Sequence, residues 1–577
     1  MTMTMQATAA VAVDRKRPMT REEKRVILAS SAGTIFEWYD FYLYGSLAAI
    51  IGAQFFSAFP EATRNVFALL AFAAGFLVRP FGALVFGRLG DLVGRKYTFL
   101  MTILIMGVST FVVGLLPGYE TIGWLAPVIL IALRMLQGLA LGGEYGGAVV
   151  YVAEHAPQGR RGFFTSWIQT TATLGLLLSL MVILAVRSWT GEQAFAAWGW
   201  RIPFLLSIFL LGISVWIRLQ MEESPAFKKM KEEGALSKAP LSEAFGQWKN
   251  ARFALIALFG LVAGQAVVWY TGQFYALFFL QNILRVDMFT ANVLIAWSLI
   301  LGTAGFVIFG SLSDRIGRKP IILTGCLLAA LTYFPIFGFI TQTANPMLDK
   351  AQKATKVVVL ADMEQCSFQF NPTGTSKFTS SCDIAKALLA RSSVSYSVQE
   401  APAGSMTKIR IGDKEVASYD AAALTGDQVK TVPAAFTKSV NEALGAAGYP
   451  VPGVANADIV KMSGFFDLFR GQLILLVVAL TYLVVLVTMV YGPIAAALVE
   501  LFPTRIRYTG MSLPYHIGNG WFGGLMPATA FAMIAQSGDI YFGLWYPIVI
   551  ALGTFVIGML FVPENKDRDI FVDDKAA

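Results

Sequence analysis

Several charged side chains of this 577-residue chain stand inside long apolar stretches. A charge at bilayer depth costs several kcal/mol unless it is paired or functional, so these residues are the first candidates for chemistry. Glu37 and Asp40 are three residues apart and therefore share one face of a helix. Two close carboxylates repel each other, which favours a proton on one of them and suits proton transfer. The alternative is that both carboxylates pair with a base such as Arg79 or Arg134.

A second polar group begins at Arg134. Gln137 shares its helix face, and Glu144 and Tyr145 follow in the same apolar stretch, among glycines that allow close helix packing. Because an arginine fork binds a carboxylate through two parallel hydrogen bonds, Arg134 is predicted to contact substrate or the coupling ion. The alternative is permanent neutralisation of Arg134 by an acidic residue of the first helix.

Two further arginines, Arg79 and Arg201, stand next to residues that predict a position at a cavity or at the membrane interface. Arg79 precedes Pro80, where a helix is weakened, and we expect it to line a cavity. Arg201 follows Trp198 and Trp200, which predicts either attraction of anions at the outer mouth or plain anchoring at the membrane interface.

The second half of the chain contributes two more candidate groups. A polar and aromatic stripe recurs at helical spacing and is predicted either to line a cavity or to pack between helices: Gln265, Trp269, Tyr270 and Gln273. His516 and Asn519 are three residues apart, and a histidine can titrate near neutral pH. The alternative for His516 is a packed hydrogen-bonding group.

A ten-residue phrase occurs twice. Gly87-Arg-Leu-Gly-Asp91-Leu-Val-Gly94-Arg95-Lys96 recurs 223 residues later as Gly310-Ser-Leu-Ser-Asp314-Arg-Ile-Gly317-Arg318-Lys319. A second phrase, with Glu154 and Glu500 as its first residues, repeats at an offset of 346 residues. Duplicated membrane halves are typical of secondary transporters, and the larger offset predicts 123 inserted residues in the second half. The repeated charges predict a gate that holds the cytoplasmic side shut, formed by Asp91, Arg95, Glu154, Asp314, Arg315, Arg318, Glu500 and Arg505.

The elements that must position these residues are membrane helices. The chain is 56% hydrophobic and only 14% charged, whereas soluble domains average about 25% charged residues. Twelve apolar runs approach or exceed the roughly 20 residues that span a bilayer as helix. They are predicted at 27–54, 66–87, 97–117, 124–150, 163–186, 202–221, 252–282, 290–312, 320–342, 468–498, 511–536 and 541–562.

The net charge of +8 is concentrated in the N-terminal tail and in alternate short loops. This distribution argues against nucleic-acid binding and predicts, by the positive-inside rule, that both termini and residues 222–250 are cytoplasmic. The predicted units are tail 1–26, bundle 27–221, central loop 222–250, helices 251–344, insertion 345–465, helices 466–563 and tail 564–577.

Residues 345–465 contain no run long enough to span and are predicted to form a small α+β domain outside the cytoplasm. Strands are expected at 356–362 and 408–413, and helices at 380–391 and 434–446. Cys366 and Cys382 are its only cysteines, and a disulfide is predicted between them, with two free thiols as the alternative. We find no metal-ligand spacing, phosphate loop or nucleophile triad in this domain.

Several phrases carry a family resemblance. They are Glu37-Trp-Tyr-Asp40-Phe-Tyr, Phe76-Leu-Val-Arg79-Pro-Phe-Gly, Arg134-Met-Leu-Gln137-Gly, Trp198-Gly-Trp-Arg201-Ile-Pro and Tyr491-Gly-Pro, followed by Glu500-Leu-Phe-Pro-Thr-Arg. With the duplicated phrase, they resemble the metabolite–proton symporter branch of the major facilitator superfamily, which includes α-ketoglutarate, proline/betaine, shikimate and citrate permeases. The resemblance covers nearly the whole chain except 345–465. It implies twelve helices in two pseudo-symmetric bundles and alternating access.

The resulting prediction is an inner-membrane symporter, not an enzyme, that carries a small metabolite with a proton. An organic acid such as a dicarboxylate is favoured, and a zwitterion of the betaine type is the alternative. A more remote alternative is a sensor that reads a ligand through the inserted domain. No cofactor or metal is expected, since the proton gradient supplies the driving force. The expected partners are the substrate, the proton and the lipid bilayer, with no nucleic acid, and the expected state is a monomer.

Overall fold

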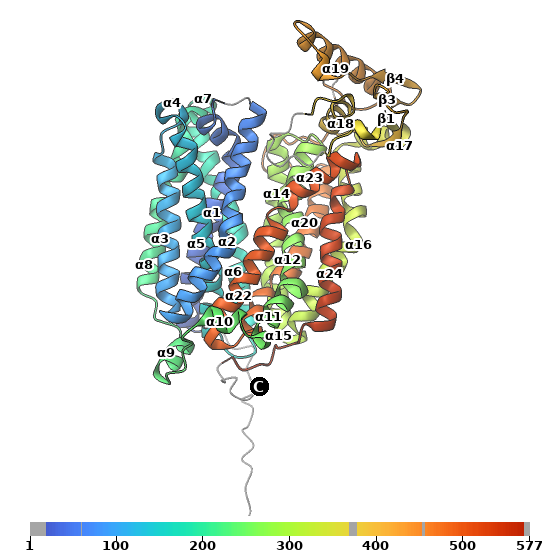
Figure 1. Ribbon diagram of the computed structural model, residues 1–577. Coiled ribbons are helices and arrows are strands. Elements are labelled where there is room, and N and C mark those ends of the chain that lie inside the picture. Colours follow the sequence, from blue (N-terminus) through green and yellow to red (C-terminus); the bar gives the residue numbers. More distant parts are fainter. Residues whose placement is uncertain (1–18, 59–60, 369–377, 453–455, 571–577) are drawn as a thin grey trace, which may run out of the picture.

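The computed structural model describes residues 19–58, 61–368, 378–452 and 456–570. Parts of the predicted tails 1–26 and 564–577 and of the predicted insertion therefore lie outside the described residues. The described chain forms two helical bundles that lie side by side, with a small lobe at one end (Figure 1).

The first bundle contains six long helices. They are α1 (Arg21–Phe55), α2 (Glu61–Leu92), α3 (Arg95–Leu115), α5 (Leu125–His155), α6 (Arg161–Thr190) and α8 (Arg201–Leu219). The short helices α4 (Tyr119–Ile122) and α7 (Glu192–Ala194) lie in the connections at the same end of the bundle (Figure 1). Helix α2 packs along α5, where Gly138 and Gly142 approach the main chain of α2 so closely that a Cβ would collide with it. This contact brings Arg79 of α2 and Arg134 of α5 into one bundle core.

The second bundle also crosses its length six times, but most of its helices are broken. One continuous run, Trp248–Ile283, contains α11 (Trp248–Ala257), α12 (Ala263–Tyr270) and α13 (Ala276–Phe278), joined by π-helical turns. The others are α14 (Met288–Gly302) with α15 (Ala304–Ile316), α16 (Arg318–Ala344), α20 (Gly471–Tyr491) with α21 (Ile494–Leu501), α22 (Arg507–Ile517) with α23 (Met526–Ser537), and α24 (Trp545–Phe561). The wide turn Gly518–Gly523 lies between α22 and α23. His516 near the end of α22 and Asn519 in the turn are both buried.

Nine helices among the described residues are long and apolar enough to cross a membrane. The twelve predicted spans are consistent with this number, because the other three crossings are α1, α2 and the broken pair α22–α23. Helix α1 carries Glu37 and Asp40 within its length, and α2 carries Arg79, so these helices contain the polar residues that the sequence singled out.

Two short helices connect the bundles. Helix α9 (Pro225–Glu232) and α10 (Pro240–Phe245) lie at the end of the molecule opposite the lobe (Figure 1). Asp91 and Asp314 end α2 and α15 on this side, and we call it the gate end. The opposite side is called the lobe end.

The lobe is built on a four-stranded sheet in the order β2-β1-β3-β4. Its strands are β1 (Val357–Ala361), β2 (Tyr396–Glu400), β3 (Lys408–Ile411) and β4 (Lys414–Ala417), and its helices are α17 (Pro346–Ala354), α18 (Ser381–Arg391) and α19 (Gln428–Ala446). Strands β1 and β2 run parallel and are connected through α18, as a parallel pair requires a crossover. Strands β2 and β4 were not expected, since both are short and mostly exposed. A disulfide joins Cys366 to Cys382.

The lobe is attached to the second bundle by hydrogen bonds to several helix ends. The Tyr396 N–H donates to the Gly538 carbonyl at 2.9 Å, beyond the end of α23. The Ser393 hydroxyl donates to the Asn282 carbonyl at 3.3 Å, and the Asn345 side chain donates to the Leu284 carbonyl at 2.9 Å. The lobe therefore extends the second bundle, and it lies above that bundle in Figure 1.

Candidate functional site

The charges inside the first bundle form two buried pairs. Asp40 of α1 accepts from Arg134 and from Gln137 of α5, each at 3.3 Å. Arg134 also donates to Gln137 at 2.5 Å, and Gln137 donates to Thr110 of α3 at 2.9 Å. Asp40 and Arg134 are 1% and 4% exposed. Arg134 is therefore neutralised within the protein, which is the alternative that the sequence left open.

The second pair joins Glu144 of α5 to Arg218 of α8. Thr102 donates to the same carboxylate at 2.7 Å, and Arg218 donates to the Phe99 carbonyl at 2.6 Å. The charge of Glu144 is therefore neutralised by Arg218, a residue that the sequence did not single out. Arg218 lies close to the end of an apolar run, where a basic residue looks like an interfacial anchor.

Arg201 forms hydrogen bonds to main-chain carbonyls at the end of helix α3. Its guanidinium donates to the Gly114 and Leu116 carbonyls at 3.1 and 2.5 Å, at the C-terminus of α3, and lies over the Trp200 ring. These carbonyls have no partner within the helix, so a cation is favourable there. The guanidinium of Arg201 is thus already bonded at the end of α3, a role that neither sequence interpretation, anion attraction or interfacial anchoring, had specified.

Three buried polar residues near the middle of the molecule lack such partners. Arg79 is 8% exposed, lies over the rings of Phe41 and Phe76, and has no hydrogen bond or ion pair among the described residues. Oε2 of Glu37 and both ring nitrogens of His516 are buried without a partner. Helix α2, which carries Arg79, packs against α1, which carries Glu37, and against α22, which carries His516. A buried polar group without a partner is costly, so this trio is the strongest candidate for a binding site.

Aromatic rings from both bundles surround this trio. Trp38 of α1 meets Trp269 of α12 with their centroids 5.1 Å apart. Tyr145 of α5 stacks on Tyr515 of α22 at 3.7 Å, and the Tyr515 and Tyr491 hydroxyls lie 2.9 Å apart. The interface between the bundles is therefore aromatic at mid-depth, and a bound molecule there would contact both bundles.

The predicted stripe of the second bundle also reaches the interface. Gln265 and Asn519 form a reciprocal amide pair at 3.2 Å within the second bundle, which is a packing role. Tyr270 packs against Phe76, with the ring centroids 6.1 Å apart. Gln273 accepts from Tyr42 of the first bundle at 3.0 Å, while its Nε2 and the Trp269 Nε1 are buried donors without an acceptor.

The repeated phrase forms two matching contacts at the gate end. Asp314 accepts from the backbone N–H groups of Gly162 and Phe163, both at 2.8 Å, at the start of α6 in the other bundle. Asp91 accepts from the Thr509 N–H at 2.8 Å, at the start of α22. Each aspartate thus bonds the N-terminus of a helix across the interface, where the helix dipole favours an anion. A Cβ on Gly162 would collide with the Gly310 carbonyl, so glycine is required there.

Each of the two aspartates at the gate end also forms an ion pair with an arginine of its own bundle. Arg95 pairs with Asp91 at 2.6 Å, and Arg318 pairs with Asp314 at 2.8 Å and with Glu500 at 2.9 Å. Two further ion pairs cross between the bundles. Arg507 donates to Glu154 at 2.9 Å, and Arg161 lies 3.6 Å from Glu500. We refer to these residues together with Asp91 and Asp314 as the lock.

Two residues that were predicted in the gate lie outside the lock. Arg315 is exposed on the outer face of α15. Arg505 pairs at 2.7 Å with Glu243 of α10, at the surface. The arginines that take part are Arg161 and Arg507, which belong to the second repeated phrase and occupy equivalent positions in it. That equivalence was the signal that could have identified them.

Two glutamates and the end of the described chain also hold the gate end together. Glu223 accepts from the Arg95 N–H at 3.0 Å, and Glu564 accepts from the Lys319 N–H at 3.0 Å, so each glutamate binds the start of the helix that follows a repeated phrase. Beyond Glu564, the Arg568 carbonyl accepts from Arg161 at 2.7 Å and the Ile570 carbonyl accepts from Arg507 at 3.2 Å. This segment therefore contacts lock residues of both bundles.

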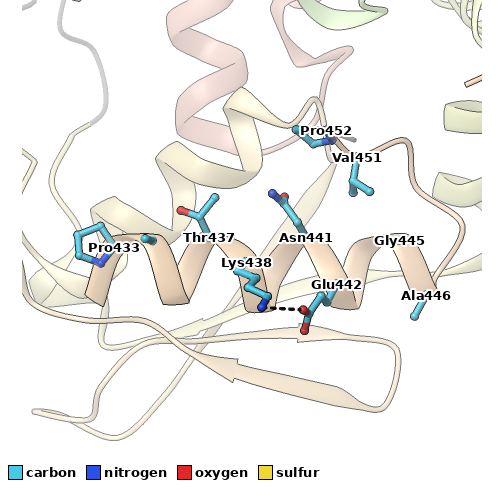
Figure 2. A pocket seen from close by; sticks show the side chains of 10 residues that line it. Pro433, Thr437, Lys438, Asn441, Glu442, Gly445, Ala446, Val451 and Pro452 are labelled. Atoms are coloured by element: carbon cyan, nitrogen blue, oxygen red, sulfur yellow. Dashed lines mark ion pairs between the residues drawn. The ribbon is translucent and has the colours of Figure 1, made fainter. Parts of the chain in front are cut away.

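The lobe carries an open hollow of about 770 Å³ beside α19, bordered by Val451 and Pro452 (Figure 2). Its only charged lining residues, Lys438 and Glu442, already pair with each other at 4.0 Å. The hollow contains none of the unpartnered groups described above, so the central trio is the better candidate site.

Comparison with known proteins places this geometry among transporters. A family described as "Sugar (and other) transporter" matches residues 26–250, and one described as "MFS/sugar transport protein" matches residues 147–360. The shikimate transporter of Escherichia coli K12 is 37% identical over 318 residues, which are 54% of this chain and 72% of that protein.

The alpha-ketoglutarate permease of E. coli K12 is 34% identical over 59% of this chain and 78% of the permease. The proline/betaine transporter of the same strain is 37% identical over 54% of this chain and 64% of that protein. Among solved structures, the proton:xylose symporter XylE aligns with a TM-score of 0.57 and 15% identity over 95% of this chain and 98% of XylE. At this identity the likeness concerns the fold alone.

Proposed function

The chain belongs to the major facilitator superfamily of membrane transporters, and from this premise we propose that it carries a small carboxylate-bearing metabolite together with a proton. Shikimate, α-ketoglutarate, proline and betaine, the compounds named for its relatives, all contain a carboxylate. A carboxylate is therefore the chemical group that the proposal assigns to the substrate.

The single observation that supports this proposal is the unpartnered guanidinium of Arg79. It is buried at mid-depth beside Glu37 and His516, while the other candidate arginines of the first bundle are already bonded to Asp40, to Glu144 or to main-chain carbonyls. A guanidinium offers a planar pair of N–H donors that matches a carboxylate, and a desolvated guanidinium gains most from such a partner. Arg79 is thus assigned the substrate carboxylate.

In this proposal Glu37 binds the proton that is transported with the substrate. Arg79 can compensate either an ionised Glu37 or a substrate carboxylate, but two anions beside one buried cation leave an uncompensated negative charge. Substrate binding therefore favours a proton on Glu37, and a proton on Glu37 favours substrate binding to the same degree. The predicted partner Asp40 is less suited to this role because Arg134 and Gln137 hold it.

Alternating access follows from the two-bundle architecture. In the proposed cycle the lock closes one side of the central site, and its release lets the bundles rock and open that side. In this proposal the gate end is cytoplasmic, because its loops are basic and the positive-inside rule favours that side, and the lobe lies on the outer side of an inner membrane. The lobe would then move with the second bundle, to which its hydrogen bonds tie it.

A zwitterionic substrate remains the second candidate, and one observation favours it. Trp38 and Trp269 face each other across the interface, and tryptophan rings attract quaternary ammonium groups. A betaine would place its carboxylate at Arg79 and its ammonium against a free face of one of these rings.

The proposal is tested by uptake and counterflow in proteoliposomes, with and without an inward proton gradient. Glu37→Gln removes the proton carrier, so gradient-driven accumulation should be lost while counterflow of the labelled substrate persists. Glu192→Gln, in an exposed pair with Arg187, is the matched control and should keep both activities. Gradient-driven accumulation by Glu37→Gln at the level of the unaltered protein would refute the assignment of the proton.

A further inference from the structure

The central site offers one uncompensated positive charge. Of the buried arginines and lysines in the described membrane-spanning helices, every one but Arg79 has a carboxylate partner within 4.0 Å. His516 packs its ring edge-on against Tyr515, and both of its ring nitrogens are buried without a partner, a position in which a charged ring would be costly. Glu144 and Arg218 also lie near Glu37, but they pair with each other, so Arg79 and Glu37 are the charged residues at the site without an ion-pair partner.

The remaining lining is uncharged. Trp38, Trp269, Tyr145 and Tyr515 present ring faces and edges. Buried donors without acceptors are found at Trp269 Nε1 and Gln273 Nε2. Such groups suit an apolar or cyclic body with neutral oxygen atoms, because an oxygen acceptor would satisfy the two bare donors.

From this charge balance we infer that the substrate is a monocarboxylate: one carboxylate binds Arg79, and the rest of the molecule enters the aromatic part of the site without a second negative charge. The inference rests on the proposed function and narrows it. It replaces the dicarboxylate favoured from sequence, because a second carboxylate would be buried without a cation and beside Glu37. Cyclic hydroxy acids and betaines both satisfy it, since each carries one carboxylate.

A matched pair of probes tests the number of charges directly. 2-Oxoglutarate and its monomethyl ester share one carbon skeleton and differ by one negative charge. Labelled substrate counterflow is measured in proteoliposomes of the full chain with each probe as competitor, alongside shikimate and glycine betaine. The penalty for an unpaired charge at bilayer depth predicts that the ester competes on the order of 100-fold better than the diacid.

The outcomes separate the inference from the proposed function. Competition by the diacid equal to or better than by its ester overturns the inference but leaves carboxylate symport standing. Failure of every carboxylate to be transported or to compete overturns both. Comparing competition by shikimate with competition by glycine betaine decides whether the site prefers a monocarboxylate whose remainder is uncharged or one whose remainder is cationic.

Arg79 itself supplies the second test. Arg79→Gln should abolish binding of all the monocarboxylates, whereas Arg79→Lys, which keeps the charge but loses the fork, should retain measurable counterflow. Thermal unfolding of each purified variant verifies that it is folded. A folded Arg79→Gln variant that still transports a monocarboxylate would contradict the assignment.

Discussion

Exchanging Arg507 for glutamine is expected to weaken the lock, while the same exchange at Arg505 is not. The two arginines are two residues apart, yet Arg507 is buried and bonds Glu154 of the other bundle, whereas Arg505 is exposed and bonds Glu243 of α10. Comparing the two substitutions therefore separates the effect of the lock from the general effect of removing a positive charge at the gate end.

The magnitude follows from the contacts that cross between bundles. Arg507 donates to Val499, Thr504 and Ile570, but these lie in its own half or in the tail, so their loss lowers overall stability without favouring opening. The bond to Glu154 is the part lost on opening, and a hydrogen bond between charged groups contributes about 1.5–3 kcal/mol. Arg507→Gln should therefore raise the ratio of open to closed molecules roughly 10- to 150-fold. An exposed pair contributes at most about 1 kcal/mol, so Arg505→Gln should change the ratio less than about 5-fold.

The assay measures the separation of the bundles at the gate end. Val93 and Ile316 are exposed and occupy equivalent positions just after the two repeated aspartates. Spin labels on cysteines at these sites report their distance distribution, and the native Cys326 is buried while Cys366 and Cys382 are bonded to each other. The longer-distance population should grow in Arg507→Gln and remain nearly unchanged in Arg505→Gln. Equal shifts in both variants, or none in Arg507→Gln with an unchanged unfolding temperature, would refute the lock.

Three further outcomes are expected. Asp40→Asn leaves Arg134 buried without its counter-ion and should destabilise the protein by about 3–5 kcal/mol in chemical unfolding; a loss below about 1 kcal/mol would mean that the pair is not buried in solution. Cys382→Ser should lower the stability of the lobe by about 3 kcal/mol, seen as faster proteolysis between α16 and α20, and a reducing agent should accelerate proteolysis of the unaltered chain but not of this variant. Two backbone N–H groups, of Gly404 and Glu364, hold the pKa of Asp362 below its ordinary value, so its contribution to stability is present above about pH 4 and is lost as the pH falls below that. Asp362→Asn should therefore flatten the acid-side increase in proteolysis of the lobe, and an unchanged pH profile would contradict this.

Much of the fold follows from the sequence. The repeat around Asp91 and Asp314 predicted two equivalent bundles, and the larger offset between Glu154 and Glu500 predicted where extra residues enter the second one. Both predictions depend on local features, namely apolar length and repeated spacing, which a chain carries before it folds. The lobe was harder, because strands β2 and β4 are short and mostly exposed and so lack the alternating pattern of a half-buried strand.

The site was only partly predictable. Arg79, Arg134 and Glu37 could be singled out as charges in apolar runs, because burying a charge is costly in any fold. Which arginine is neutralised could not be read from the chain, since the partners lie 94 residues apart for Arg134 and Asp40 and 74 apart for Arg218 and Glu144. Only the packing of helices from distant parts of the sequence decides that Arg79 is the one buried arginine of the described membrane helices without a carboxylate partner.

The gate shows the same division at closer range. The sequence by itself determined that repeated acidic and basic residues meet at one end of the molecule, because both copies follow an apolar run of membrane-spanning length. The tertiary structure decided that Arg507 bonds the other bundle and Arg505 lies at the surface, because Arg507 is the first residue of α22 whereas Arg505 lies in the preceding short turn, Thr504–Ile506. Residue types and spacing thus determine which charges are costly, whereas the contacts between helices determine which of the buried charges in the described helices are paired and which are left without a partner.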